Sequence, residues 1–147
     1  MNPMIDRRRL LTAGLAFGAL FAAPRLKACE FFAETLRVTH PWTRVTAADA
    51  PFAVVSMRFD EVTAADRLIG VITPVASGAE LGGPDGTRRL DFAIPEGRET
   101  RLGEDGLHLR LTGLRQPLEL GRSYPMQLVF EKGGVINTQL SVDFNAA

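Results

Sequence analysis

The chain has few of the side chains that form cross-links or bind soft metals. Its 147 residues include one cysteine, Cys29, and two histidines, His40 and His108. A single cysteine excludes an intrachain disulfide, so a folded domain must be held together by its hydrophobic core. Two histidines without an evident nucleophile or paired acid leave little from which to build a catalytic site. The sequence therefore predicts a protein that is not an enzyme.

Basic residues are not in excess. The whole chain carries 17 basic and 17 acidic residues, but five basic residues and one acid precede residue 29. Residues 29–147 therefore hold 12 basic and 16 acidic side chains. A mildly acidic segment without a basic cluster predicts no nucleic-acid partner, because phosphate binding needs concentrated lysine and arginine.

The one long hydrophobic run lies at the start of the chain. Leu10–Ala23 is a 14-residue apolar stretch that follows the charged segment Met1–Arg9 and ends before Pro24. This order is typical of an export signal, and the run is too short for a stable membrane anchor. Asp6-Arg7-Arg8-Arg9-Leu10-Leu11 also resembles a twin-arginine signal, although consecutive arginines occur in ordinary secretion signals too. We expect an export signal over residues 1–28 and a periplasmic protein, with a structural N-terminal helix as the less favoured alternative.

Cys29 can be interpreted in several ways. Leu26-Lys27-Ala28-Cys29 resembles a lipobox, but the lysine before the small residue fits that pattern poorly. Cys29 is expected first to carry a lipid anchor or to belong to the discarded signal, and only then to be a free thiol or a soft metal ligand. The protein would contact a membrane only if Cys29 were lipidated. Residues 29–34 are expected to form a linker.

From Thr35 onward the chain alternates between apolar and polar residues in short runs separated by Gly, Pro and Asp. Met57 and Met126 fall on apolar faces and are expected in the core. About seven or eight strands within residues 35–144 predict an all-β domain, an antiparallel sandwich. The runs are Leu36–Arg44, Phe52–Asp60, Arg67–Thr73, Ala79–Leu81, Arg89–Ile94, Gly106–Leu114, Tyr124–Glu131 and Val135–Phe144.

The clearest alternation surrounds His108. In Gly106–Leu114, strand geometry sends Leu107, Leu109 and Leu111 to one face and His108 and Arg110 to the other. One interpretation is a polar strand face with an exposed imidazole. The other is that His108 is the remnant of a metal site.

Several short segments follow one another in a recognisable order. They are His40-Pro41-Trp42-Thr43-Arg44, Ala65-Asp66-Arg67-Leu68-Ile69-Gly70, Pro74-Val75-Ala76, Ala79-Glu80-Leu81, Ile94-Pro95-Glu96-Gly97, His108, Gly113-Leu114-Arg115-Gln116-Pro117-Leu118 and Phe130-Glu131-Lys132. In this order they closely resemble the periplasmic PCu(A)C copper chaperone family, over nearly all of Val38–Val142. The resemblance implies a cupredoxin-like Greek-key sandwich that binds Cu(I) outside the cytoplasm and supplies it for respiratory oxidase assembly or copper homeostasis. The implied partner is a copper-accepting oxidase subunit or another periplasmic protein.

The copper ligands of that family are mostly missing here. The family carries a histidine where this chain has Gly82, a methionine in the hairpin that here reads Gly83-Pro84-Asp85-Gly86, and a methionine where this chain has Arg110. Only His108 is kept. Thioether sulfur and imidazole suit Cu(I), whereas a guanidinium has no lone pair and repels a cation.

Arg110 therefore suggests another use for this face. With Arg88 and Arg89 it is expected to form a positive patch that receives an anion or an acidic partner, although surface arginines often contribute nothing measurable. Cys29 and His40 are the only other candidate metal ligands, and their spacing does not predict a site. Two functions remain open: a copper chaperone-like protein with a rearranged site, and a metal-free binding module on the same scaffold.

Overall fold

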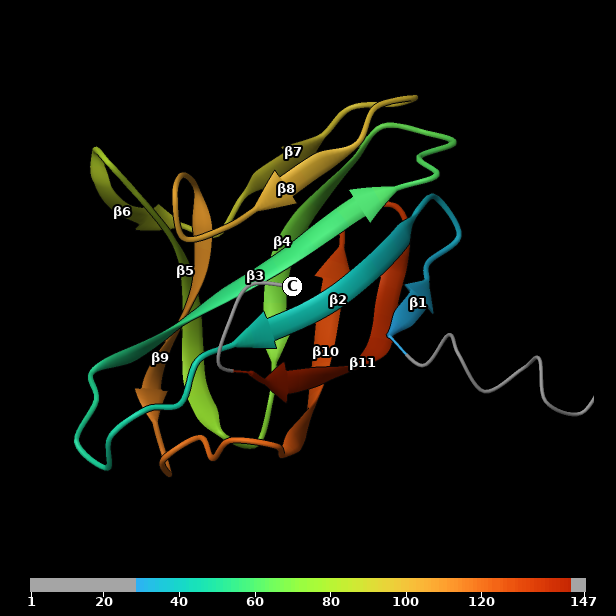
Figure 1. Ribbon diagram of the computed structural model, residues 1–147. Helices are drawn as coiled ribbons and strands as arrows, with labels where there is room; N and C mark the ends of the chain where they lie inside the picture. The colour runs from blue at the N-terminus through green and yellow to red at the C-terminus, as the bar shows by residue number, and fades with distance from the viewer. Residues whose placement is uncertain (1–28, 144–147) are drawn as a thin grey trace, which may run out of the picture.

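The computed structural model describes residues 29–143, which form eleven β-strands and no helix (Figure 1). The export signal expected over residues 1–28 lies outside these described residues. Within residues 29–143 no helix has the length and apolar character that a membrane span requires. The strands are β1 (Glu30–Phe32), β2 (Arg37–Thr43), β3 (Phe52–Asp60), β4 (Asp66–Ile72), β5 (Ala76–Gly83), β6 (Gly86–Arg89), β7 (Phe92–Ile94), β8 (Thr100–Leu102), β9 (His108–Leu114), β10 (Ser123–Phe130) and β11 (Gly134–Val142).

The strands pair in one curled sheet, in the order β6-β5-β9-β3-β2-β11-β10-β4-β7, with β1 added to β2 and β8 to β3. In Figure 1 the long strands β2 and β3 lie in front of β4 and β10, so the curled sheet forms two layers. The predicted all-β class is confirmed, but the pairing is mixed because β2 and β11 run parallel. More strands occur than expected because β1 and β8 have three residues each, too few for alternation to be recognised. In addition, the run Arg89–Ile94, expected as one strand, is divided between β6 and β7.

The core lies between the layers and follows the predicted alternation. Met57 of β3 and Met126 of β10 are 3% and 1% exposed, which confirms their assignment to the core. Phe59 is fully buried and packs edge-on against Phe130, with ring centres 6.1 Å apart. Side chains of this size each contribute about 1.5–3 kcal/mol when fully buried.

Turn residues close the hairpins where the sequence predicts them. Pro84 and Asp85 connect β5 to β6, and Gly86 adopts a φ of 106° that other residues avoid. Residues 131–133 connect β10 to β11. Residues 29–34, expected to be a linker, instead contribute β1, which pairs antiparallel with β2.

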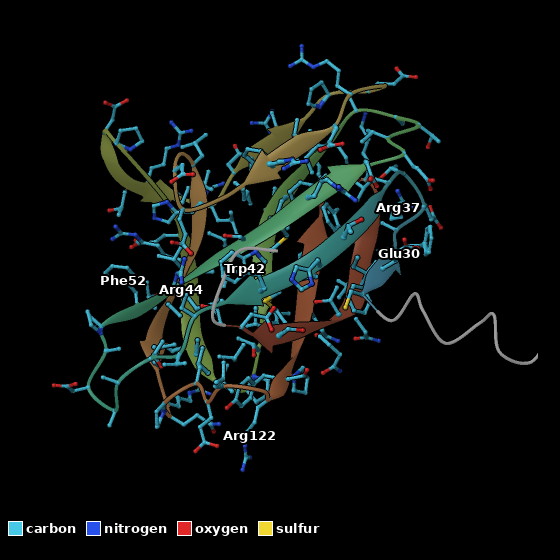
Figure 2. The ribbon with its side chains drawn as sticks, in the orientation of Figure 1. Glu30, Arg37, Trp42, Arg44, Phe52 and Arg122 are labelled. Carbon is cyan, nitrogen blue, oxygen red and sulfur yellow. The ribbon has the colours of Figure 1, made fainter. Side chains whose placement is uncertain are left out.

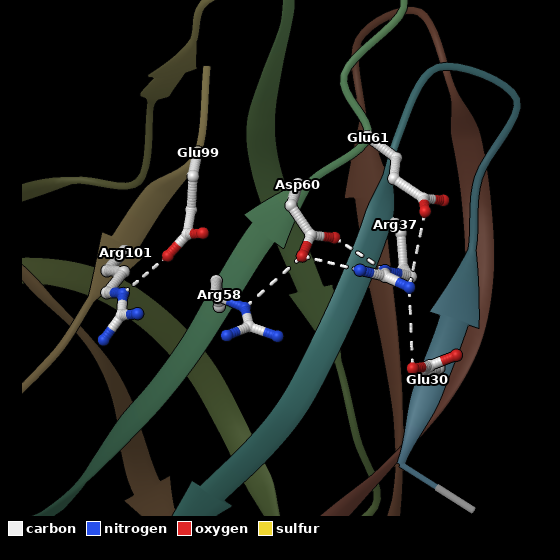
Figure 3. Close-up of polar contacts among 7 residues, drawn as sticks. All are labelled: Glu30, Arg37, Arg58, Asp60, Glu61, Glu99 and Arg101. Atoms are coloured by element: carbon white, nitrogen blue, oxygen red, sulfur yellow. Dashed lines mark hydrogen bonds and ion pairs between the residues drawn. The ribbon is translucent and has the colours of Figure 1, made fainter. Parts of the chain in front are cut away.

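A cluster of ion pairs joins β1, β2 and β3 on the outer face of the sheet (Figure 3). Arg37 bonds both carboxylate oxygens of Asp60, at 2.7 and 2.8 Å, and also lies near Glu30 and Glu61. The hydrogen bond from Arg37 holds the pKa of Asp60 below its ordinary value. The cluster fixes Arg37 and Asp60 as a charge-assisted pair between two neighbouring strands.

Asp66 is a second polar centre, buried at the start of β4. Its carboxylate accepts hydrogen bonds from the backbone N–H groups of Arg67, Lys132 and Gly133 and from the hydroxyl of Thr35, at 2.7–2.8 Å. Burial alone raises the pKa of Asp66, but these hydrogen bonds to the carboxylate outweigh burial and lower it. Asp66 thus ties the β10–β11 turn to β4 and to the loop before β2.

Candidate functional site

His108 is the first residue of β9, which pairs with β5 on one side and β3 on the other. The predicted exposed imidazole is wrong, because His108 is only 8% exposed. Leu107, predicted to enter the core, is 37% exposed, whereas Leu109 and Leu111 are fully buried as expected. The reason is that β9 starts at His108, so Leu107 belongs to the preceding loop and does not follow the alternation of the strand.

Both nitrogens of the His108 ring are engaged. Nδ1 lies 3.0 Å from the carbonyl oxygen of Gly106, and the Nε of Arg110 donates to His108 Nε2 at 3.2 Å. A guanidinium can only donate, so Nε2 must accept and Nδ1 must carry the ring proton. In this arrangement the single available lone pair of the His108 ring is occupied by Arg110.

Arg110 is itself held from its other side. Its guanidinium carbon lies 4.0 Å from the ring centre of Phe52, which begins β3 and is labelled in Figure 2. Such cation–π contacts contribute about 0.5–2 kcal/mol, depending on how well water is excluded. Arg110 is thus fixed between the aromatic ring and the imidazole.

Gly82 of β5 completes this packing. It lies directly across from His108 in the β5–β9 register, and a Cβ atom added to it would overlap both His108 Nε2 and Arg110 Nε. Only a residue without a side chain leaves room for the two groups to meet. Gly82, His108 and Arg110 therefore form one arrangement, here called the closed histidine site, which fills the space where the resemblance implies two further copper ligands.

Arg88 and Arg89, the other residues of the expected positive patch, divide between the two faces of the β5–β6 hairpin. Arg89 pairs with Glu80, which in turn pairs with Arg110, so these three side chains share one face. Arg88 pairs with Leu81, whose side chain is buried in the core. Glu80 was missed by the sequence analysis, although it lies two residues before Gly82 and so shares its face. Its negative charge offsets part of the predicted positive patch.

His40 and Cys29, the weaker metal candidates, are brought together by the β1–β2 pairing. The backbone N–H of His40 donates to the carbonyl of Cys29 at 2.8 Å, and His40 Nε2 lies 3.2 Å from a carboxylate oxygen of Asp143. His40 occupies a bulge with a positive φ of 49°. Neither residue joins His108, because β3 separates β2 from β9. Within residues 29–143 no three His, Cys, Asp or Glu side chains are placed to hold a metal ion.

The residues present at the closed histidine site therefore do not fit Cu(I) in the manner that the resemblance implies. The site contains one imidazole, and its lone pair already accepts a hydrogen bond from Arg110. The guanidinium of Arg110 also places a permanent positive charge beside it. Next to these residues is a cavity of about 350 Å³ lined by His108, Phe52, Arg44 and Glu104, among others. Its walls carry charged and aromatic groups that suit recognition of another molecule.

Comparison with known proteins identifies the family. The family model described as "Putative lipoprotein LpqE-like" matches residues 36–142. A comparison with curated proteins finds no match. Among solved structures, the copper-bound PCuAC domain from PmoF2 is 23% identical with a TM-score of 0.71, and the match covers 79% of this chain and 98% of that one. The apo PCuAC domain from PmoF1 is 24% identical with a TM-score of 0.71, and the match covers 79% of this chain and 99% of that one.

A third structure shares somewhat more sequence. The solution structure of the Cu(I) form of DR1885 from Deinococcus radiodurans is 27% identical with a TM-score of 0.57, and the match covers 84% of this chain and 87% of that one. These structures share the all-β fold of the present domain. The chain belongs to the LpqE-like family, and its fold is that of the PCuAC copper chaperone domains.

Proposed function

We propose that this protein is an exported, periplasmic relative of the copper chaperones that acts as a metal-free binding module, because its own copper position is closed. The contact between Arg110 Nε and His108 Nε2 carries the proposal. It occupies the imidazole lone pair and places a permanent cation where a second cation would have to bind. The partner is a periplasmic protein or an anion that meets the face around Arg110.

A second candidate function is supported by the retention of His108 and by the copper-bound forms of PmoF2 and DR1885. In this alternative the protein binds Cu(I) through His108 after Arg110 has moved away. It would deliver the ion to a copper-accepting subunit of a respiratory oxidase. The lipoprotein description of the family supports export for both candidates, and it supports a lipid anchor at Cys29.

Titration of the purified protein with Cu(I) against a colorimetric chelator separates the two functions. We expect no competition from the wild-type protein. We expect Arg110→Met to compete, with a gain in affinity of about a hundredfold or more, because two unit charges about 4 Å apart repel by about 4 kcal/mol near a protein surface. The new methionine also adds a thioether beside the imidazole.

The matched control is Arg115→Met, because Arg115 is an exposed arginine in the loop after β9. It adds the same thioether away from His108 and should leave Cu(I) affinity unchanged. His108→Ala in the Arg110→Met background should abolish the gain. Tight one-to-one binding by the wild-type protein that His108→Ala removes would overturn the metal-free function and establish the second candidate.

A further inference from the structure

A second and larger cavity, of about 620 Å³, lies over the outer face of β2 and β3 and beneath the loop of residues 103–107. We call it the Trp42 pocket. Trp42 is only 7% exposed, yet it lies outside the main hydrophobic core, on the side of the sheet that faces this cavity. The volume falls in the range of small-molecule sites, about 300–1,000 Å³.

Two arginines stand together at the wall of the Trp42 pocket. Arg58 of β3 and Arg101 of β8 are directly opposite in the register of the two strands. Like charges at such positions destabilise a sheet unless something compensates them. Each Nε faces a carboxylate: Arg101 bonds Glu99 at 2.8 Å, and Arg58 lies 3.4 Å from Asp60.

The terminal nitrogens of both guanidinium groups point away from these carboxylates. Figure 3 shows the terminal nitrogens of Arg58 and Arg101 pointing away from Asp60 and Glu99, on the same side of the two strands. Two planar forks side by side match the geometry of a carboxylate, which accepts parallel hydrogen bonds from a guanidinium. Glu99 holds the Arg101 guanidinium by a hydrogen bond, whereas Asp60 attracts Arg58 only as an ion pair.

Thr39 continues this row onto β2, since it pairs with Arg58 across the β2–β3 ladder. Its Oγ1 is buried and has no hydrogen-bond partner among the described residues, and Arg58 Nε also lacks a well-aligned one. Buried polar atoms are nearly always bonded, and leaving one unpaired costs about 1–3 kcal/mol. The row of Thr39, Arg58 and Arg101 is therefore prepared to bond something that enters the pocket.

We propose that the Trp42 pocket binds a carboxylate attached to a small aromatic or apolar body. Arg58 and Arg101 take the carboxylate, and Thr39 donates its hydroxyl. The body lies on the Trp42 side of the pocket, where the Arg44 guanidinium is 5.6 Å from the ring centre of Trp42. A doubly charged phosphate fits less well, because Asp105 on the covering loop is acidic and the third arginine of the pocket, Arg44, is already paired with Glu104 at 2.8 Å. The carboxylate can belong to a free acid or to the C-terminus of a peptide. The site lies apart from His108 and does not depend on whether Cu(I) binds there.

Trp42 makes the test direct, because it is the only tryptophan of the chain. Titration of the purified protein with benzoate, followed by tryptophan fluorescence, should give a saturable change. The uncharged benzamide has the same shape and should give none. A short peptide ending in phenylalanine with a free carboxylate, compared with its C-terminal amide, distinguishes a peptide source from a free acid.

Variants locate the binding groups. Arg58→Gln and Arg101→Gln should each weaken binding of the responding carboxylate about tenfold or more, because each removes a charge-assisted pair of hydrogen bonds. The matched control Arg115→Gln should leave the affinity unchanged. Thr39→Val keeps the shape of the side chain and removes only the unpaired hydroxyl, so it guards against unfolding as the cause of a loss. We expect it to weaken binding about threefold or more while the melting temperature is unchanged.

Three outcomes would overturn the proposal. If benzamide matched benzoate, if Arg115→Gln lowered the affinity as much as Arg58→Gln, or if neither carboxylate probe altered the fluorescence at about 10 mM, the pocket would not be a carboxylate site. Saturation by one probe and not the other would identify which source of carboxylate the pocket accepts.

Discussion

The closed histidine site and the Trp42 pocket treat their polar groups in opposite ways. At the first, His108 and Arg110 bond each other, and Phe52 covers the guanidinium. At the second, Thr39 Oγ1 and the ends of the Arg58 and Arg101 side chains are not used up within the sheet. At the closed histidine site the polar groups bond one another, whereas at the Trp42 pocket they remain available to a ligand.

The difference teaches where binding should be sought on this scaffold. A PCuAC fold directs attention to His108, yet the local chemistry there is complete without a metal. The pocket beside Trp42 is incomplete by the same standard, since buried polar atoms without partners are uncommon in folded proteins. The fold alone does not determine which of the two surfaces is functional.

The largest expected effect comes from replacing a buried polar side chain whose hydrogen bonds are all made within the protein, as they are at the closed histidine site. Asp66 has four hydrogen bonds to its carboxylate, and Asp66→Asn would turn one acceptor oxygen into a donor that faces other donors. We expect a loss of about 3 kcal/mol or more in the free energy of unfolding, measured by denaturant titration. Asp85→Asn, in the exposed β5–β6 turn, is the control and should change stability by less than about 0.5 kcal/mol.

The same residue predicts a pH dependence. The folded pKa of Asp66 is lowered, so its contribution is fully present above the unfolded pKa of about 3.9 and is lost as the pH falls through the lower folded value. The stability of the wild-type protein should therefore fall below about pH 4, and that of Asp66→Asn should fall less steeply. Equal slopes for the two proteins would contradict the role of the Asp66 carboxylate.

Much of the fold could be predicted from the sequence, because strand alternation is a local property. The inward faces of β3 and β10 and the Gly-rich hairpins followed from spacing alone. The closed state of His108 could not be predicted, because it depends on Gly82 being opposite in the register and on Phe52 reaching over from a third strand. Resemblance identified Gly82 and Arg110 as departures from a pattern. Only the β5–β9 pairing shows that the missing side chain of Gly82 leaves the space in which Arg110 meets His108.

The interdependence of Gly82 and Arg110 can be measured. Gly82→Ala should destabilise the protein by about 1–3 kcal/mol, because the added methyl overlaps His108 and Arg110. In the Arg110→Met background the cost should shrink by about 0.5 kcal/mol or more, since the flexible thioether can move aside. A double-mutant cycle of unfolding free energies gives the coupling. Strict additivity would show that the two positions do not share one space.

The smallest expected effect separates the two regions most cleanly, because it compares two threonines of the same strand. Thr43 Oγ1 donates to the carbonyl of Val54 at 2.7 Å, whereas Thr39 Oγ1 has no partner among the described residues. Replacing each by valine removes a hydroxyl and keeps the branched shape. Thr43→Val should cost about 1 kcal/mol in the free energy of unfolding, and Thr39→Val should cost nothing or stabilise slightly, because an unpaired buried hydroxyl is removed. If Thr39→Val were as costly as Thr43→Val, the hydroxyl of Thr39 would already be bonded within the protein, and the pocket would be as closed as the site around His108.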